Sequence, residues 1–388
     1  MKRAAGFTLL EVLVSVAILT FVMAGISTVL VKQSQLSEKQ SQERDMEQSG
    51  RLALMDLARA VRLAGYGINP LAAFDFDRFA CTSPGTASSC PNGGRDRIDG
   101  PDEVVMAWRD PVFYRTATGV TGSAAGPWTV TLGSALADPL NANRIVQMLC
   151  VGAEPSVYLA VNGDTAAGAT SLVLRKLTAA DGYFTGYLSA GGAANVAPLD
   201  GCFATAGVML VERVRYYVAN DTDGAPSLFR DRGRGAQERL YRGIEDLQLT
   251  YDIGRPPAGS AFASGGATPA AAPACGATLW TFGTCATAGT PLETAATPIW
   301  QTDNYDSVNR YSGHPVNIRT VNIYVVAATT RLSSDGTGDN VPALGNRPAR
   351  AADKYHRSVL SVTETPENLL GRAHFLPPVF ANSNVGGG

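Results

Sequence analysis

The chain has 388 residues, a formal net charge of −2, and 45% hydrophobic against 17% charged residues. This length allows a sizeable core and, taken alone, about two or three domains. The 32 basic and 34 acidic side chains leave no positive excess of the kind that marks a nucleic-acid-binding surface, so no nucleic-acid partner is expected. The 41 glycines and 22 prolines favour loop-rich β structure over a helical bundle.

The segment from Gly6 to Val31 is apolar for long enough to cross a bilayer, which takes about 20 mostly apolar residues. Glu11 is its only charge, and its other polar residues are small. An ordinary secretory signal would have a shorter apolar core followed by a small-x-small cleavage site. A plain single-span anchor would leave Glu11 unexplained, because ionisable groups in a span usually have a partner.

One helix is expected to run on past the apolar segment, over residues 7 to about 64, which is about 85 Å at 1.5 Å per residue. The composition turns polar after Val31, and no proline occurs before Pro70. Gly65 and Gly67 then form a stop signal together with Pro70. The apolar residues near the end of the helix have the i, i+3, i+4, i+7 spacing of one buried face: Leu54, Leu57, Ala58 and Val61.

Beyond Pro70 the sequence changes to short strand candidates between turns rich in Gly, Ala and Pro. The strands between residues 128 and 174 have the character of an insertion or of an elaborated β subdomain. Residues 254–298 are expected to form a long surface loop. The strand candidates are residues 103–108, 128–132, 145–149, 157–161, 171–174, 208–218, 227–230, 244–251, 316–327 and 357–363.

Other polar clusters favour structural roles over chemistry. The run from Asp221 to Gly224 and the run 335–340 faintly resemble calcium loops, but neither has the late bidentate acid such loops need, so a hairpin turn and a surface loop are expected. Glu245 and Asp246 are adjacent, and on a regular strand they would point to opposite faces, which excludes an acid–base pair. No serine-hydrolase elbow, zinc-protease or phosphate-loop motif occurs, so we expect neither enzymatic activity nor a cofactor.

Two further polar features also favour structural roles. The three arginines of the run RDRGRG could form a basic patch that contacts DNA, but an aspartate interrupts the run and no aromatic residues alternate with it, so a solvated loop is favoured. The scarce histidines include one directly before a proline, which is expected to mark the start of a strand. These residues are Arg230, Arg232, Arg234 and His314.

The N-terminus reads KRAAG at 2–6 followed by FTLLEV at 7–12. This run resembles the class III leader and mature start of type IV pilins and type II secretion pseudopilins. It implies that a prepilin peptidase cleaves between Gly6 and Phe7, that the new N-terminal Phe7 is methylated, and that Glu11 pairs with the N-terminal amine of an adjacent subunit. This pairing would set the axial register of docking.

The later strands contain, in this order, the runs VRYYV, SLFR, GIEDLQLTY, VNIRTVNI and YHRSVLSVT. These runs resemble the C-terminal half of PilW-type minor pilins and their J-type secretion counterparts. The resemblance implies an α+β fold of the type IV pilin kind, with a long helix packed on an antiparallel sheet. The organisation it implies is a leader (1–6), a transmembrane and filament-core helix (7–31), its amphipathic continuation (32–68) and a β-rich domain with inserted loops (69–388).

In this family the implied function is that of a minor pilin in the complex that primes or caps a type IV pilus. The alternatives are a J-type minor pseudopilin of a type II secretion system and a tip pilin that contacts DNA or a surface; the size of the middle region favours the pilus. The implied partners are prepilin peptidase, other minor pilins, the major pilin and a tip adhesin. The implied location is the inner membrane, with the C-terminal domain in the periplasm, and afterwards the pilus at the cell surface.

Six cysteines in a domain outside the inner membrane indicate disulfides, although six allow fifteen pairings. Sequential pairing is the expectation. The first and third bridges would then close short loops, each stabilising the fold by roughly 3 kcal/mol. No Cys-x-x-Cys pair occurs and no histidine lies near, so a metal site is not expected. The expected bridges are Cys81–Cys90, Cys150–Cys202 and Cys275–Cys285.

Overall fold

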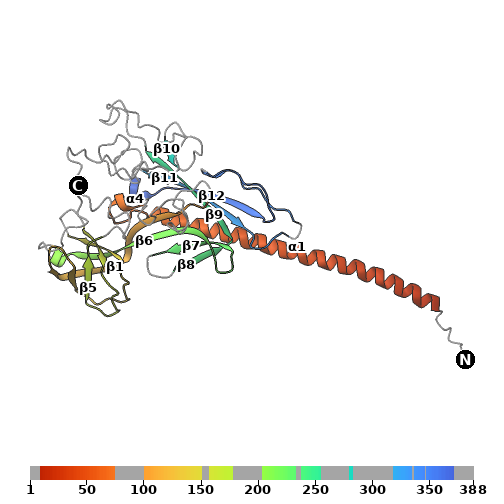
Figure 1. The fold of residues 1–388 in the computed structure, drawn as a ribbon, viewed down its shortest axis with the longest axis horizontal. Helices are drawn as coiled ribbons and strands as arrows, with labels where there is room; N and C mark the ends of the chain where they lie inside the picture. The colour runs from red at the N-terminus through yellow and green to blue at the C-terminus, as the bar shows by residue number, and fades with distance from the viewer. Residues whose placement is uncertain are drawn as a thin grey trace.

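The computed structural model combines one long N-terminal helix with two antiparallel β-sheets that gather around its C-terminal half (Figure 1). The chain is therefore an α+β protein, as expected. The described residues are 9–74, 100–150, 157–177, 203–232, 237–254, 279–282, 318–333, 336–345 and 347–370.

Helix α1 runs over 55 residues, Leu9–Leu63, which agrees with the expected span. Gly65 and Gly67 follow it with φ angles of 81° and 66°, so the stop signal acts through backbone conformations that favour glycine. The expected apolar face is confirmed: Leu57, Ala58 and Val61 are buried, and Leu54 packs against the same core.

The C-terminal end of α1 is closed by groups from elsewhere in the chain. The Gly65 N–H donates to the Ala107 carbonyl at 2.9 Å. The Asn368 amide Nδ2, from the short helix α4 (Glu367–Leu370), donates to the carbonyls of Arg62 and Ala64 at 3.0 and 3.2 Å. Helix ends leave carbonyls without helical partners, so these bonds fix the helix to the sheets at its last turn.

The larger sheet has eight strands in the order β1-β2-β5-β4-β3-β6-β7-β8, and β1 also pairs with β6. That extra pairing closes β1 to β6 into a six-stranded ring with its own apolar core, which includes Trp128, Met148 and Leu159. The expected subdomain between residues 128 and 174 is therefore part of this ring. The strands are β1 (Val104–Gly122), β2 (Trp128–Leu132), β3 (Ile145–Leu149), β4 (Val157–Val161), β5 (Ser171–Arg175), β6 (Gly207–Asn220), β7 (Pro226–Asp231) and β8 (Glu238–Arg242).

The smaller sheet has the order β10-β9-β11-β12. Its strands pack with α1 and with the far halves of β1 and β6 in one apolar core that includes Leu57, Met106, Leu247 and Val325. Short 3-10 turns lie at Pro70–Ala72 and Phe203–Thr205. The strands are β9 (Ile244–Gly254), β10 (Leu279–Phe282), β11 (Ile318–Ala328) and β12 (Arg357–Glu364).

Three strand expectations need correction. β1 continues to Gly122 instead of ending at Trp108, because its chain bulges at Asp110, whose Oδ1 accepts from the N–H groups of Val112 and Phe113 at 2.8 and 3.3 Å. β8 was not expected as a strand. β10 lies inside the segment 254–298, which was expected to be all loop; residues 255–278 and 283–298 lie outside the described part.

At Gly50, helix α1 approaches the smaller sheet closely. A Cβ added there would lie 2.5 Å from Leu360 Cδ1 and 3.1 Å from Ala327 Cβ. We expect Gly50→Leu to lower the free energy of unfolding by about 1–3 kcal/mol, since overpacking forces side chains off their rotamers. Urea denaturation of the detergent-solubilised chain measures this. The control is Gly25→Leu, where nothing lies within 4 Å; equal midpoints for the two variants would contradict the packing argument.

Candidate functional site

The first half of α1 extends away from the sheets as a free apolar helix (Figure 1). Its large side chains are open to the surroundings: Phe21 is 81% exposed and Leu13 is 60% exposed. Within the described residues it is the one helix that length and composition allow to cross a membrane. A continuous apolar surface of this size needs a cover, either lipid or other protein.

Hydroxyl groups in this half are bonded to carbonyls of the helix itself. Ser15 Oγ donates to the Glu11 carbonyl at 2.7 Å, and Thr28 Oγ1 donates to the Ala24 carbonyl at 2.8 Å. Such back-bonding hides hydroxyl groups from an apolar environment. Glu11 itself lies in the first turn with an exposed side chain, while Gly6 and Phe7 lie outside the described residues. The structure therefore places the expected acid on the free apolar helix.

The second half of α1 is tied to the sheets by polar contacts. Arg62 makes two bonds of 2.9 Å to the Glu364 carboxylate at the end of β12. The Tyr241 hydroxyl on β8 donates to Asp56 Oδ2 at 2.7 Å. Burial, reinforced by Asp56, raises the pKa of Tyr241 to about 12. These contacts hold the helix in one position on the domain, so its free half projects in a fixed direction.

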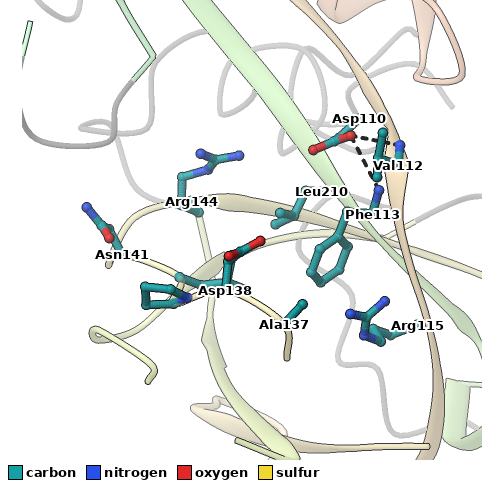
Figure 2. Close-up of a pocket in the computed structure, with 11 residues that line it drawn as sticks. Asp110, Val112, Phe113, Arg115, Ala137, Asp138, Asn141, Arg144 and Leu210 are labelled. Atoms are coloured by element: carbon teal, nitrogen blue, oxygen red, sulfur yellow. Dashed lines mark hydrogen bonds between the residues drawn. The ribbon is translucent and has the colours of Figure 1, made fainter. Parts of the chain in front are cut away.

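A pocket of about 190 Å³ lies on the ring, beside the bulge of β1 (Figure 2). Figure 2 shows Asp110, Asp138 and Arg115 around the ring of Phe113. Ligand pockets usually measure about 300–1,000 Å³, so this one has room for little more than a single side chain. Arg144, on its wall, is held in a buried ion pair with Glu212 at 2.6 Å. The pocket does not assemble a catalytic constellation from the residues that line it.

Glu245 and Asp246 come together, contrary to the expectation of opposite faces. The β9–β11 register shifts at this point, with Val326 opposite Asp246 and Ala327 opposite Ile244, so Glu245 is a bulged residue. Both acids therefore reach Arg350, whose Nη1 lies 2.7 Å from Glu245 Oε1 and whose Nη2 lies 3.2 Å from Asp246 Oδ2.

Arginines fix this acidic pair in a structural role. Arg347 also contacts Asp246, and Arg357 lies 2.5 Å from Glu245. Burial raises the pKa of Asp246, and the attraction of the arginines opposes that rise. Together these ion pairs anchor the connection between β11 and β12 to the start of β9.

The turn from Asp221 to Gly224 joins β6 to β7 as a hairpin, as expected. Asp221 Oδ1 accepts from the Thr222 N–H at 2.7 Å, and Asp223 Oδ1 accepts from the Ala225 N–H at 3.1 Å, so both carboxylates brace the turn. Among the described residues no cluster of three His, Cys, Asp or Glu side chains could hold a metal ion. Part of the run 335–340 lies outside the described residues.

The remaining candidates are only partly placed. Arg230 on β7 pairs with Glu238 at 2.9 Å, and Arg232 follows just after that strand. Cys150 is buried in the ring core and disulfide-bonded. The pairing of the cysteines stays a prediction, because the other five cysteines of the expected bridges lie outside the described residues: Cys81, Cys90, Cys202, Cys275 and Cys285. Arg234 and His314 also lie outside the described residues.

Residues 1–27 match a family model described as the prokaryotic N-terminal methylation motif. No curated protein and no solved structure matches the chain. The motif supports a type IV pilin or pseudopilin, and with it processing by a prepilin peptidase, anchoring in a membrane and assembly with other pilins. The motif suggests a structural role.

Proposed function

We propose that this chain is a minor pilin that takes part in assembling a type IV pilus, as a member of the complex that primes or caps the fibre. The observation that carries the proposal is the methylation motif on a helix whose apolar half is free while its other half is docked to a β-rich domain. An exposed apolar helix can be covered by lipid before assembly and by neighbouring helices in the filament core afterwards.

The proposed chemistry begins with cleavage between Gly6 and Phe7, followed by N-methylation of Phe7. Cleavage gives the chain a positive N-terminus close to the negative side chain of Glu11. In a dry filament core a buried acid is tolerated when a cation lies beside it. The amine of a neighbouring Phe7 is the proposed cation, so Glu11 would align one subunit with the next.

A J-type minor pseudopilin of a type II secretion system is the second candidate, because pseudopilins carry the same N-terminal motif. The six-stranded ring adds a large unit to the β-rich domain, and this elaboration favours the pilus. A tip pilin with an adhesive or DNA-contacting role would use the same ring. The proposed partners are prepilin peptidase, other minor pilins, the major pilin and a tip adhesin.

Mass spectrometry of the chain purified from membranes tests the first step. We expect a mature N-terminus at N-methylated Phe7; an intact Met1, or a start at another residue, would overturn the proposal. Deletion of the gene then separates the two systems. Loss of surface pili and twitching supports the minor pilin, whereas loss of exoprotein release with pili intact supports the pseudopilin.

A further inference from the structure

The connection between β11 and β12 lies against α1 just beyond the apolar segment. Arg331 Nη1 is 2.7 Å from Glu38 Oε1 on the helix, and Leu332 lines a small depression with Gln35 and Gln42. In Figure 1 this blue connection is the part of the β-rich domain that reaches towards the free half of α1. The domain therefore has a defined underside that faces the membrane-spanning segment.

The height of this underside follows from helix geometry. At 1.5 Å per residue, Gln35 lies about 6 Å and Glu38 about 10 Å beyond Val31, the last residue of the apolar run. The headgroup layer on each side of a bilayer is about 5–8 Å thick. When the apolar run spans the hydrocarbon core, the connection therefore stands at the outer edge of the headgroups, within reach of long side chains.

Basic side chains gather at this underside, and the acids among them have basic partners: Glu38, which is 55% exposed, pairs with Arg331. Arg331 is 74% exposed, and its neighbour Leu332 is an apolar side chain that is 56% exposed. Two nearby acids are held by one arginine: Asp339 Oδ2 accepts from the Arg357 N–H at 2.9 Å, and Asp353 Oδ2 lies 2.6 Å from Arg357 Nη2. The basic side chains of the helix and the connection in this region are Lys32, Lys39, Arg331 and Lys354.

We propose that Lys32, Arg331, Leu332 and Lys354 form a juxtamembrane surface that contacts anionic phospholipid headgroups while the subunit waits in the membrane. The proposal rests on the proposed membrane-anchored function. Basic groups near a bilayer are drawn to anionic lipid within about a Debye length, roughly 8 Å at physiological salt. The exposed Leu332 beside them lies at the same height, where it can pack against the headgroup layer. This contact would hold the domain at a set angle before assembly.

Hydrogen exchange of the full chain in nanodiscs tests this contact. One set of nanodiscs contains phosphatidylcholine alone, and the other contains phosphatidylglycerol as one lipid in three. We expect the amides of Arg331 and Leu332 to exchange about threefold or more slowly in the anionic nanodiscs, and the difference to shrink at high salt. Equal exchange in the two lipids would overturn the proposal.

Matched variants assign the effect to this surface. Arg331→Gln and Leu332→Ser are expected to reduce the lipid-dependent difference. Arg51→Gln and Val112→Ser are the controls, because Arg51 is an exposed arginine paired with a helix glutamate and Val112 is an 86% exposed apolar residue on the ring.

A further variant, Lys354→Gln, separates lipid contact from the Arg331–Glu38 ion pair, which it leaves in place. It is expected to reduce the lipid-dependent difference as well. Control variants that act as strongly as the test variants would overturn the proposal. A chain that fails to enter nanodiscs of either composition would instead refute the membrane-anchored function.

Discussion

Replacing Glu11 with glutamine is expected to leave processing and membrane insertion intact and to lower incorporation into filaments about a hundredfold or more. Removing one partner of a buried ion pair costs about 3–5 kcal/mol, and each 1.4 kcal/mol is a tenfold change in an equilibrium. Glutamine keeps the shape of the side chain, so the loss would come from the charge that faces the amine of a neighbouring Phe7.

Ser15→Ala is the matched control for this variant. Ser15 lies on the same exposed half of α1, and its hydroxyl is already bonded to the Glu11 carbonyl within the helix. Its loss is therefore expected to leave incorporation near the wild-type level. The fraction of each chain in sheared filaments, measured by quantitative immunoblotting against total processed chain, gives the result. Wild-type incorporation of Glu11→Gln would show that no such charge pair aligns the subunits.

The sequence was sufficient to predict α1 because its signals are local. The apolar run, the repeat of Leu57 and Val61 on one face, and the stop at Gly65 are all contained within neighbouring residues. Glu11 stood out for the same reason, as one charge in an apolar segment. The matching strands β2, β3 and β4 were also predicted at their observed bounds, since each is a short run between turn signals.

The features that were missed depend on contacts between distant residues. The first strand candidate was expected only over 103–108, yet pairing with β6 carries β1 past Asp110 and Pro111 as a bulge. A bulge at Glu245 likewise overrides the alternation expected of a regular strand. The contact between Arg331 and Glu38 joins residues 293 positions apart, so no local sequence pattern predicts it. Closure of the six-stranded ring likewise depends on the pairing of β1 with β6, which lie far apart in the sequence.

The buried pair of Arg144 and Glu212 is expected to be a major determinant of domain stability. The side chains are 6% and 7% exposed and lie 2.6 Å apart, where β6 passes beside the start of β3. Glu212→Gln would leave the guanidinium buried without this counter-charge, so we expect the free energy of unfolding to fall by about 3–5 kcal/mol. Thermal and urea unfolding of the solubilised chain measure the change.

Two further variants separate charge burial from the mere loss of an ion pair. Glu238→Gln breaks the pair with Arg230, in which Glu238 is 54% exposed, and is expected to cost less than about 1 kcal/mol. The double change Arg144→Met with Glu212→Leu is expected to regain most of the lost stability, because apolar residues of similar volume often replace a buried pair without loss. If Glu212→Gln lowers the free energy of unfolding no more than Glu238→Gln does, burial of the Arg144–Glu212 pair is not a major determinant of stability.

Glu11→Gln and Glu212→Gln are expected to affect different properties: the first changes incorporation into filaments, and the second changes the stability of the β-rich domain. Glu11 lies on the free half of α1, away from both cores, so its replacement is expected to leave the unfolding of the β-rich domain unchanged. Glu212 lies in the domain, so chains that still fold at low temperature are expected to enter filaments normally. A Glu11 variant that unfolds early, or folded Glu212 variants that do not assemble, would show that the helix and the domain are not independent in these two roles.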